Sequence, residues 1–198
     1  MICLVCNKGS FDGLTHPKCQ GKYTIDGAFS AINYKGVVKK LIYDFKYKPY
    51  LSDLNKTLTE LFYESIIQNE IFQKALNASP AGEPILVPIP LHKKRLKKRG
   101  YNHAKLLAKG LSKKFNLRVI EVLERTKDTK SQFGLNLKDR KENIVNSFVT
   151  APNILISQYP NIFLVDDILT TGSTLLEAAK ILKRSGVRRI WGLTLARD

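Results

Sequence analysis

The chain has 198 residues, with 33 Lys and Arg against 17 Asp and Glu, a formal net charge of +16, and 43% hydrophobic residues. This apolar content is enough for a buried core and excludes wholesale disorder, and no apolar run approaches the ~18 residues that a membrane-spanning helix needs. The opening residues also lack the pattern of a signal peptide, so we expect a cytoplasmic protein without a transmembrane segment.

Hydrophobic spacing predicts strands and helices that alternate along the second half of the chain. We expect, in chain order, a strand over residues 28–34, helices over 36–47 and 51–72, a strand over 85–90, a helix over 102–115, strands over 117–123 and 162–165, a helix over 173–184 and a strand over 189–196. Residues 125–146 read as a long polar connection. This alternation predicts an α/β fold, with a parallel sheet flanked by helices.

All three cysteines lie near the amino terminus, where they form two closely spaced pairs with a histidine. The pairs are Cys3 with Cys6 and His16 with Cys19, each with two residues between. Zn²⁺ accepts three thiolates and one imidazole, and tight turns with this spacing bring two ligands to one ion. The alternative is three free thiols on a floppy terminus. We expect residues 1–27 to be a small module with a structural zinc ion, and residues 28–198 to be the main domain.

The positive charge is concentrated in one part of the chain. Residues 91–118 carry 11 basic and no acidic side chains. Lys105, Lys109 and Lys113 recur at helical spacing and indicate a solvated helix face, but the run over residues 93–99 shows no such period. A field of this sign attracts the phosphates of a nucleotide or of a nucleic acid. The candidate anion-binding residues are Lys93, Lys94, Arg95, Lys97, Lys98 and Arg99.

The most specific motif lies over residues 162–174. Four apolar residues predict a buried strand, and Asp166 and Asp167 follow at its carboxyl end, where parallel sheets bind ligands. Neighbouring carboxylates suit two sugar hydroxyls, and a loop of small residues that opens a helix suits a phosphate. The loop residues are Thr170, Thr171, Gly172, Ser173 and Thr174. Turn and helix-capping roles are the alternatives for single residues, but the ordered combination predicts a ribose 5′-phosphate site.

These residues resemble the phosphoribosyl pyrophosphate (PRPP) fingerprint of type I phosphoribosyltransferases. Together with segments 87–92, 99–104, 125–135, 140–143 and 193–197, the chain resembles the ComF family, which is associated with DNA uptake in natural transformation. This family usually has four cysteines in its amino-terminal module, and His16 stands where one of them is expected.

The resemblance implies a type I phosphoribosyltransferase-like sheet and a role for each part of the motif. Asp166 and Asp167 would bind the ribose hydroxyls, and residues 170–174 the 5′-phosphate. Residues 88–91, with Pro90 and Leu91, would form the pyrophosphate loop. Lys97, Lys98 and Arg99 would be the nearest candidates to neutralise pyrophosphate. Mg²⁺ would accompany PRPP, and residues 125–146 would form a lid.

The residues leave several functions open and identify no catalytic group. We favour a PRPP-binding protein that handles single-stranded DNA, because no duplex-binding motif appears and a basic groove with aromatic side chains suits an unpaired strand. Tyr23, Phe29 and Tyr34 are candidate aromatics, although core packing explains them equally well. The alternative is an active phosphoribosyltransferase with an unidentified nitrogenous acceptor. A third reading is an adaptor for a DNA-translocating ATPase of the uptake machinery, which would place the protein peripherally at the inner membrane.

Overall fold

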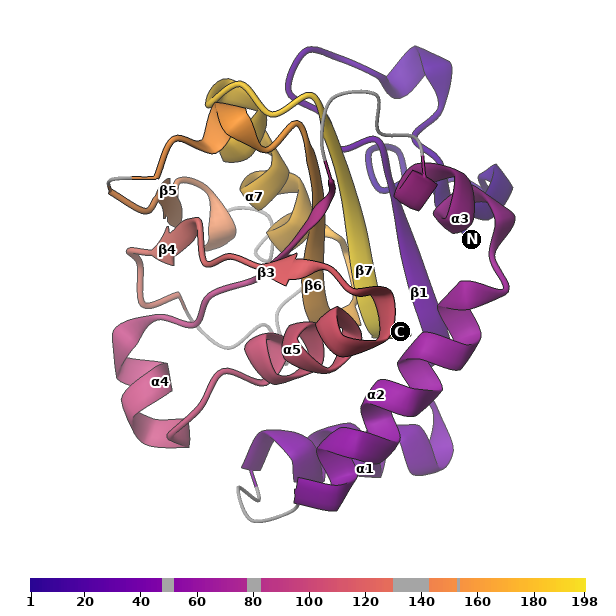
Figure 1. Ribbon diagram of the computed structural model, residues 1–198, viewed down its shortest axis with the longest axis vertical. Coiled ribbons are helices and arrows are strands. Elements are labelled where there is room, and N and C mark those ends of the chain that lie inside the picture. The colour runs from indigo at the N-terminus through magenta and orange to yellow at the C-terminus, as the bar shows by residue number, and fades with distance from the viewer. Residues whose placement is uncertain (48–51, 78–82, 130–142, 153) are drawn as a thin grey trace.

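The fold is built on one sheet of five parallel strands with the order β1-β7-β6-β2-β3 (Figure 1). The computed structural model describes residues 1–47, 52–77, 83–129, 143–152 and 154–198. The strands are β1 (Gly27–Asn33), β2 (Ile85–Pro88), β3 (Arg118–Val119), β6 (Asn161–Leu169) and β7 (Arg189–Arg197). The predicted parallel α/β sheet flanked by helices is therefore confirmed.

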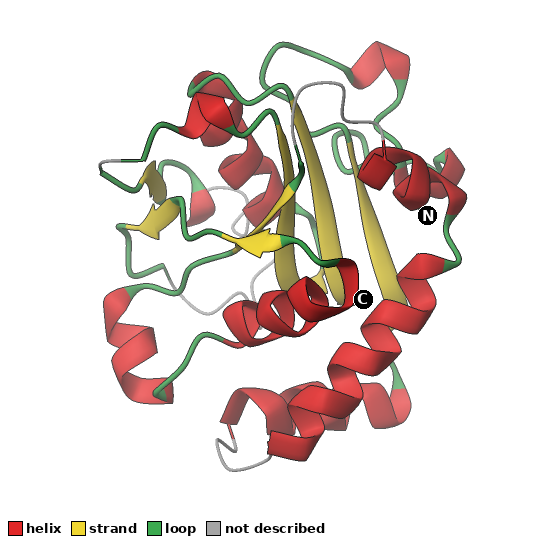
Figure 2. Cartoon of the chain, viewed as in Figure 1, coloured by secondary structure: helices red, strands yellow, loops and turns green. Residues whose placement is uncertain are grey.

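Helices cover both faces of this sheet (Figure 2). One face packs against α1 (Gly36–Tyr47), α2 (Ser52–Ile67), α3 (Glu70–Asn77) and α5 (His103–Phe115). The other face packs against α7 (Ser173–Arg184) and a small antiparallel pair, β4 (Leu123–Arg125) with β5 (Phe148–Thr150). A short helix, α4 (Lys93–Arg99), follows β2. The described residues also contain three single 3₁₀ turns, Phe11–Gly13, Pro17–Cys19 and Ile156–Gln158.

Strand β6 joins the two halves of the core because its side chains alternate between the two faces. Phe163 and Val165 belong to the core with α2 and α5, and Leu164 belongs to the core with α7. The amino-terminal residues join the α7 side, where Leu4 and Ile25 are buried in the same cluster as α7. Because β6 is buried on both faces, its polar side chains can reach the surface of the sheet only at the carboxyl end of the strand.

The predicted helix over residues 51–72 is wrong in extent, because the structure has two helices there. Asn69 interrupts it: its side-chain oxygen accepts a hydrogen bond from the Phe72 N–H (2.8 Å), so α3 starts from its own cap at Glu70. Asparagine is favoured at this capping position because it satisfies an N–H that the first helical turn leaves free. Residue 51 lies outside the described residues.

Two strand predictions also need correction. The strand expected over residues 117–123 is split between β3 in the main sheet and β4 in the small pair. The strand expected over 162–165 extends to Leu169, so both aspartates lie within β6 rather than after it. The proposed lid over residues 125–146 falls mostly on residues 130–142, outside the described part of the chain.

Candidate functional site

Asp166 and Asp167, which we call the acid pair, lie near the carboxyl end of β6. Asp167 is 5% exposed, and its Oδ1 accepts a hydrogen bond from the Ile168 N–H (2.8 Å). The Asp166 Oδ1 likewise accepts one from the Asp167 N–H (2.9 Å). Each carboxylate therefore keeps a second oxygen that is not committed to its own backbone turn.

Two basic side chains from other elements meet Asp167. Lys46 of α1 places its Nζ 2.5 Å from Asp167 Oδ2, and the Nε2 of His103, at the start of α5, lies 3.2 Å from the same oxygen. Burial alone would raise the pKa of Asp167, but the positive charges of Lys46 and His103 hold it well below its usual value. Asp167 is therefore an ionised, buried acceptor whose charge is balanced locally.

Asp166 has the opposite electrostatic setting. Burial, and then the charge of Asp167, raise the pKa of Asp166 to about 8. Arg125 of β4 lies close enough to feel the Asp166 charge, and burial and the charge of Arg95 lower the Arg125 pKa to about 10. Near pH 7 the acid pair therefore shares roughly one negative charge, and such a site hydrogen-bonds neutral hydroxyls well.

The residues 170–174, here called the phosphate loop, connect β6 to α7. Gly172 adopts a left-handed backbone (φ 71°), which glycine tolerates, and its carbonyl accepts the first helical hydrogen bond from the Leu176 N–H (2.9 Å). The buried hydroxyls of Thr171 and Ser173 lie 2.7 Å apart. A small pocket is lined by Asp166 together with residues of this loop. Asp166 and the amino terminus of α7 thus open on the same space.

The segment after β2 runs beside the acid pair. Pro88 is in register with Val165, and the Ile89 N–H donates to the Val165 carbonyl oxygen (2.9 Å). The side chain of Asn102 holds this segment from the other side through a bond from Nδ2 to the Ile89 oxygen (3.0 Å). Residues 90 and 91, predicted for the pyrophosphate loop, follow directly from this point.

The basic run over residues 93–99 is helical, although its sequence pattern predicts no helix. His92 caps α4 through its Nδ1, which accepts from the Lys94 N–H (3.4 Å), and Gly100 ends it in a left-handed conformation (φ 81°). The helix divides the charges: Lys93, Lys94, Lys97 and Lys98 are exposed, whereas Arg95 and Arg99 are partly buried. The four lysines therefore face an external anion, although Lys94 also pairs with Asp128 (3.6 Å).

The two inward arginines attach α4 to the site. Arg95 donates to the Thr129 carbonyl oxygen and lies near Arg125, and Arg99 Nη1 lies 3.4 Å from His103 Nδ1. Figure 1 shows α1, α4 and α5 gathered around the end of the sheet where β6 and β7 finish. The acid pair, the phosphate loop and the basic helix therefore converge on one edge of the sheet.

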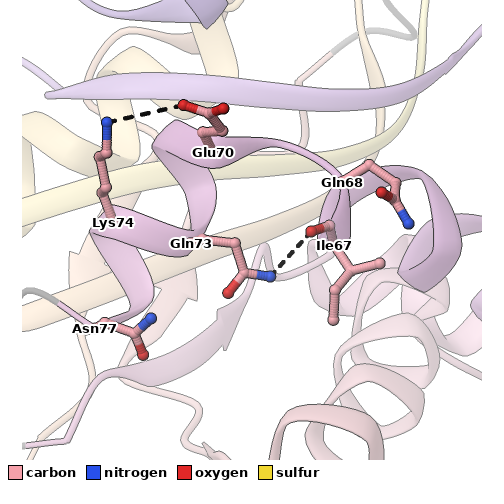
Figure 3. A pocket seen from close by; sticks show the side chains of 6 residues that line it. All are labelled: Ile67, Gln68, Glu70, Gln73, Lys74 and Asn77. Atoms are coloured by element: carbon pink, nitrogen blue, oxygen red, sulfur yellow. Dashed lines mark hydrogen bonds and ion pairs between the residues drawn. The ribbon is translucent and has the colours of Figure 1, made fainter.

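A second pocket, of about 420 Å³, lies at the junction of α2 and α3 (Figure 3). Some of its polar groups pair with one another: Lys74 lies 3.9 Å from Glu70, and the Gln73 side chain donates to the Ile67 oxygen (3.0 Å). It lies toward the other end of α2 from α1, away from the acid pair. We assign no site to this larger pocket.

The four predicted zinc ligands are brought together. One ligand atom from each of Cys3, Cys6, His16 and Cys19 lies within 4.8 Å of the others. The His16 Nε2 bonds the Gly9 carbonyl oxygen (2.9 Å), which leaves Nδ1 facing the Cys6 sulfur (3.4 Å). A backbone carbonyl that fixes the tautomer of a histidine in this way is typical of histidines that bind metal.

The pKa values of the thiols in this cluster also favour the binding of a cation. Burial would raise the pKa of Cys3, but hydrogen bonds from backbone groups, led by that of His16, lower it to about 7. Burial, and the neighbouring thiols, raise the pKa of Cys19 to about 11. Close thiolates repel one another, and a divalent cation removes that repulsion, so three thiolates and one imidazole suit Zn²⁺ in a closed structural site.

We expect the purified protein to carry about one zinc ion per chain, because four protein ligands close the coordination sphere. The variant Cys19→Ala should lose most of this metal, and His16→Cys should retain it, because a thiolate replaces the imidazole. Elemental analysis of both variants, with a chelator titration of the wild type, checks this. Equal zinc content in the wild type and in Cys19→Ala would contradict it.

A second cluster of potential ligands, at the acid pair, is a poor metal site. His103, Asp166 and Asp167 also offer ligand atoms within 4.8 Å of one another. The Lys46 ammonium already lies against the Asp167 carboxylate, and a cation there would meet its charge at short range. We therefore interpret this cluster as an acceptor for hydroxyls.

Sequence reasoning missed three residues of the site. They are Lys46, His103 and Arg125, which all approach the acid pair. The chain has many lysines, and no motif in the sequence marks Lys46. The one signal is its place on the side of α1 opposite the exposed residues of that helix. Phe29, a candidate aromatic for bases, is 1% exposed and stacks on Trp191, so it is a core residue.

The sheet, the acid pair and the phosphate loop define a phosphoribosyltransferase fold, and the comparison with protein families agrees. The phosphoribosyl transferase domain family matches residues 67–198, and the chain belongs to that family. Its similarity to competence and DNA utilization proteins places it, more narrowly, among the ComF proteins.

Three relatives illustrate this similarity. Competence protein F of Haemophilus influenzae is 41% identical over 114 residues, which is 56% of this chain and 50% of the relative. DNA utilization protein YhgH of Escherichia coli K12 is 35% identical over 111 residues, 54% of this chain and 48% of the relative. Competence protein ComFC of Bacillus subtilis is 27% identical over 164 residues, 79% of this chain and 58% of the relative. The chain thus spans about half the length of the first two.

Among the described residues, no helix is both long enough and apolar enough to cross a bilayer.

Proposed function

We propose that this protein binds PRPP at the acid pair and the phosphate loop, and handles single-stranded DNA on the adjoining helix α4 during natural transformation. The observation that carries the proposal is the convergence of these three features on one edge of the sheet. Relatives named as competence and DNA utilization proteins support the cellular role.

The groups around the site suit each part of PRPP. The acid pair would accept hydrogen bonds from the ribose hydroxyls, and the backbone and hydroxyl groups of the phosphate loop would hold the 5′-phosphate. Pro90 and Leu91 would border the pyrophosphate, whose charge Lys97, Lys98 and Arg99 would balance. Mg²⁺ would bind mainly through PRPP oxygens and water and would neutralise part of the pyrophosphate charge.

The proposal also covers the organisation of the chain and its location. Residues 1–27 form the structural zinc module, and residues 28–198 the PRPP-binding domain. The protein acts in the cytoplasm, at the inner membrane, where a DNA-translocating ATPase of the uptake machinery delivers the single strand.

Calorimetry with PRPP and Mg²⁺ tests the nucleotide half of the proposal. The double variant Asp166→Asn, Asp167→Asn should bind PRPP at least ~10-fold more weakly, because the shared negative charge that strengthens the hydrogen bonds to the ribose hydroxyls is lost. Asparagine keeps the shape of each side chain, and Glu70→Gln on the distant helix α3 is the control for lost charge. Unchanged affinity in the double variant would remove PRPP from this site.

Titration of single-stranded DNA at several salt concentrations, on the same sample, tests the other half. Binding should weaken steeply with salt, because phosphate contacts on α4 release counterions. A flat salt dependence, or no binding at low salt, would rule out DNA handling while leaving the PRPP result intact.

The second candidate function is an active phosphoribosyltransferase. Here the bond from the anomeric carbon to pyrophosphate breaks, a bond to an acceptor nitrogen forms, and the acceptor loses a proton. The charged groups around the PRPP site favour it, because the anomeric carbon becomes cationic as pyrophosphate departs. Pyrophosphate release with PRPP and a panel of nitrogenous bases would establish it, and PRPP binding without turnover across the panel would remove it.

A further inference from the structure

Two exposed tyrosines on α1 take no part in the features described so far. Tyr43 is 58% exposed and Tyr47 is 54% exposed, and their ring centroids lie 4.8 Å apart at an interplanar angle of 45°. We call them the tyrosine pair. Single exposed aromatic side chains are common, but two rings side by side on one helix form an apolar surface that suits a planar ligand.

The tyrosine pair is attached to the basic helix. The Arg99 guanidinium lies 5.1 Å from the centroid of the Tyr47 ring, and its Nη2 donates to the Tyr47 hydroxyl (3.3 Å). The same arginine reaches His103, which contacts Asp167. Lys46, the neighbour of Tyr47 in α1, meets Asp167 from its own side of the helix. The exposed rings therefore lie next to the residues that hold the acid pair.

Positive charge flanks the rings on both sides. Lys39 and Lys40 are exposed one turn before Tyr43 on α1. Beyond Arg99, the exposed lysines of α4 continue the charge. Aromatic faces between cationic side chains are what an unpaired nucleic acid requires, since its bases stack and its phosphates seek cations. A duplex hides its base faces, so this surface distinguishes the two forms.

We propose that the tyrosine pair is the stacking platform for the bases of single-stranded DNA, whose phosphates contact the lysines on either side. The proposal rests on the proposed function that α4 binds a single strand, and it adds where the bases lie. Charge complementarity selects this occupant over an apolar peptide, because the exposed Lys39 and Lys40 on one side and the exposed lysines of α4 on the other outnumber Asp44, the acidic residue between the two rings on α1.

The test compares the double variants Tyr43→Ala, Tyr47→Ala and Tyr43→Phe, Tyr47→Phe for binding to a homothymidine oligonucleotide. The alanine pair should bind ~10-fold or more weakly with a nearly unchanged salt dependence, because stacking is lost and phosphate contacts are kept. The phenylalanine pair should bind nearly as the wild type does. An oligonucleotide of the same length without bases should bind all three proteins equally.

Photochemical crosslinking gives a second, positive readout. An oligonucleotide that carries iododeoxyuridine should crosslink to Tyr43 or Tyr47 of the wild type, as located by mass spectrometry. If the wild type binds DNA with the expected salt dependence but the alanine pair binds equally well, the stacking platform is wrong and the proposed function stands. If the wild type binds no single-stranded DNA, both fail. If the alanine pair loses affinity for the abasic strand as well, the rings do not act by stacking and the inference is overturned.

Discussion

The variant Lys46→Met should lose about 3 kcal/mol of the free energy of unfolding at pH 7. Its side chain is 20% exposed and pairs at 2.5 Å with Asp167, whose side chain is 7% exposed. Removing one partner of a buried ion pair leaves the other charge without compensation, which typically costs ~3–5 kcal/mol. We take the lower value because His103 remains 3.2 Å from the same oxygen. Chemical denaturation of both proteins measures the difference.

The double variant Lys46→Met, Asp167→Asn should recover part of this loss, because the unpaired charge is then absent. Lys39→Met is the matched control, since Lys39 is an exposed lysine on the same helix and its loss should change stability by no more than ~0.5 kcal/mol. Equal stability of Lys46→Met and Lys39→Met would mean that Lys46 does not compensate the buried charge of Asp167.

The pH dependence of the stability difference between the wild type and Lys46→Met follows from the directions in which the pKa values of Asp167 and Lys46 are shifted. The pKa of Asp167 lies well below its unfolded value, so its contribution is present above pH ~4 and is lost as pH falls toward the folded pKa. Burial opposes the charge of Lys46, but Asp167 raises the Lys46 pKa above 10.5, so that contribution is lost only as pH rises beyond this value. The wild type and Lys46→Met should therefore differ most between these limits and converge in acid.

The parts of the fold that the sequence predicts best are those with both periodicity and clear ends. Helices α1 and α7 have the bounds expected for them, because apolar residues recur at helical spacing and Gly36 and Gly172 mark their starts. The long strand β6 shows the limit of this reasoning. Its last residues include two aspartates, which are rare in strands, and only pairing with β7 along its whole length explains its extent.

The residues of the candidate site also fall into two groups: those that a local sequence motif predicts, and those that only the tertiary fold brings together. The candidate zinc ligands form two evenly spaced pairs in the sequence and lie together in the structure. Most residues of the contiguous phosphate loop line one small pocket. Lys46 and Asp167 meet only through the packing of α1 against the sheet, which no spacing rule specifies. The two faces of α4 could have been predicted from the sequence. Arg95 and Arg99 are one helical turn apart, and they stand between a capping residue and a glycine.

The structure also shows why two distant motifs adjoin each other. Leu4, next to the ligand Cys3, packs where a side chain at Gly172 would lie, with its Cδ2 at 3.0 Å from that position. Gly172 is thus required both by its positive φ and by the close approach of the amino-terminal module. The amino-terminal module and the phosphate loop are therefore parts of one packed unit, although they lie near opposite ends of the chain.

The quadruple variant of Lys93, Lys94, Lys97 and Lys98 to Gln should bind single-stranded DNA about 100-fold more weakly at low salt. These four side chains point outward from α4, while Arg95 and Arg99 hold the helix in place, so the fold should survive. Each phosphate contact that is lost should also reduce the slope of log affinity against log salt by about 0.7. Fluorescence anisotropy across a salt series measures both quantities.

The control for this variant removes the same charge elsewhere, with Lys22, Lys56, Lys74 and Lys113 changed to Gln. Long-range attraction depends on net charge, which the two quadruple variants share, whereas direct phosphate contacts depend on position. If α4 contacts the strand, the control should keep the wild-type slope and lose only a small part of the affinity, chiefly through slower association. Equal loss in the two variants would mean that DNA responds to the total charge of the protein, and the basic helix would then have no special part in binding it.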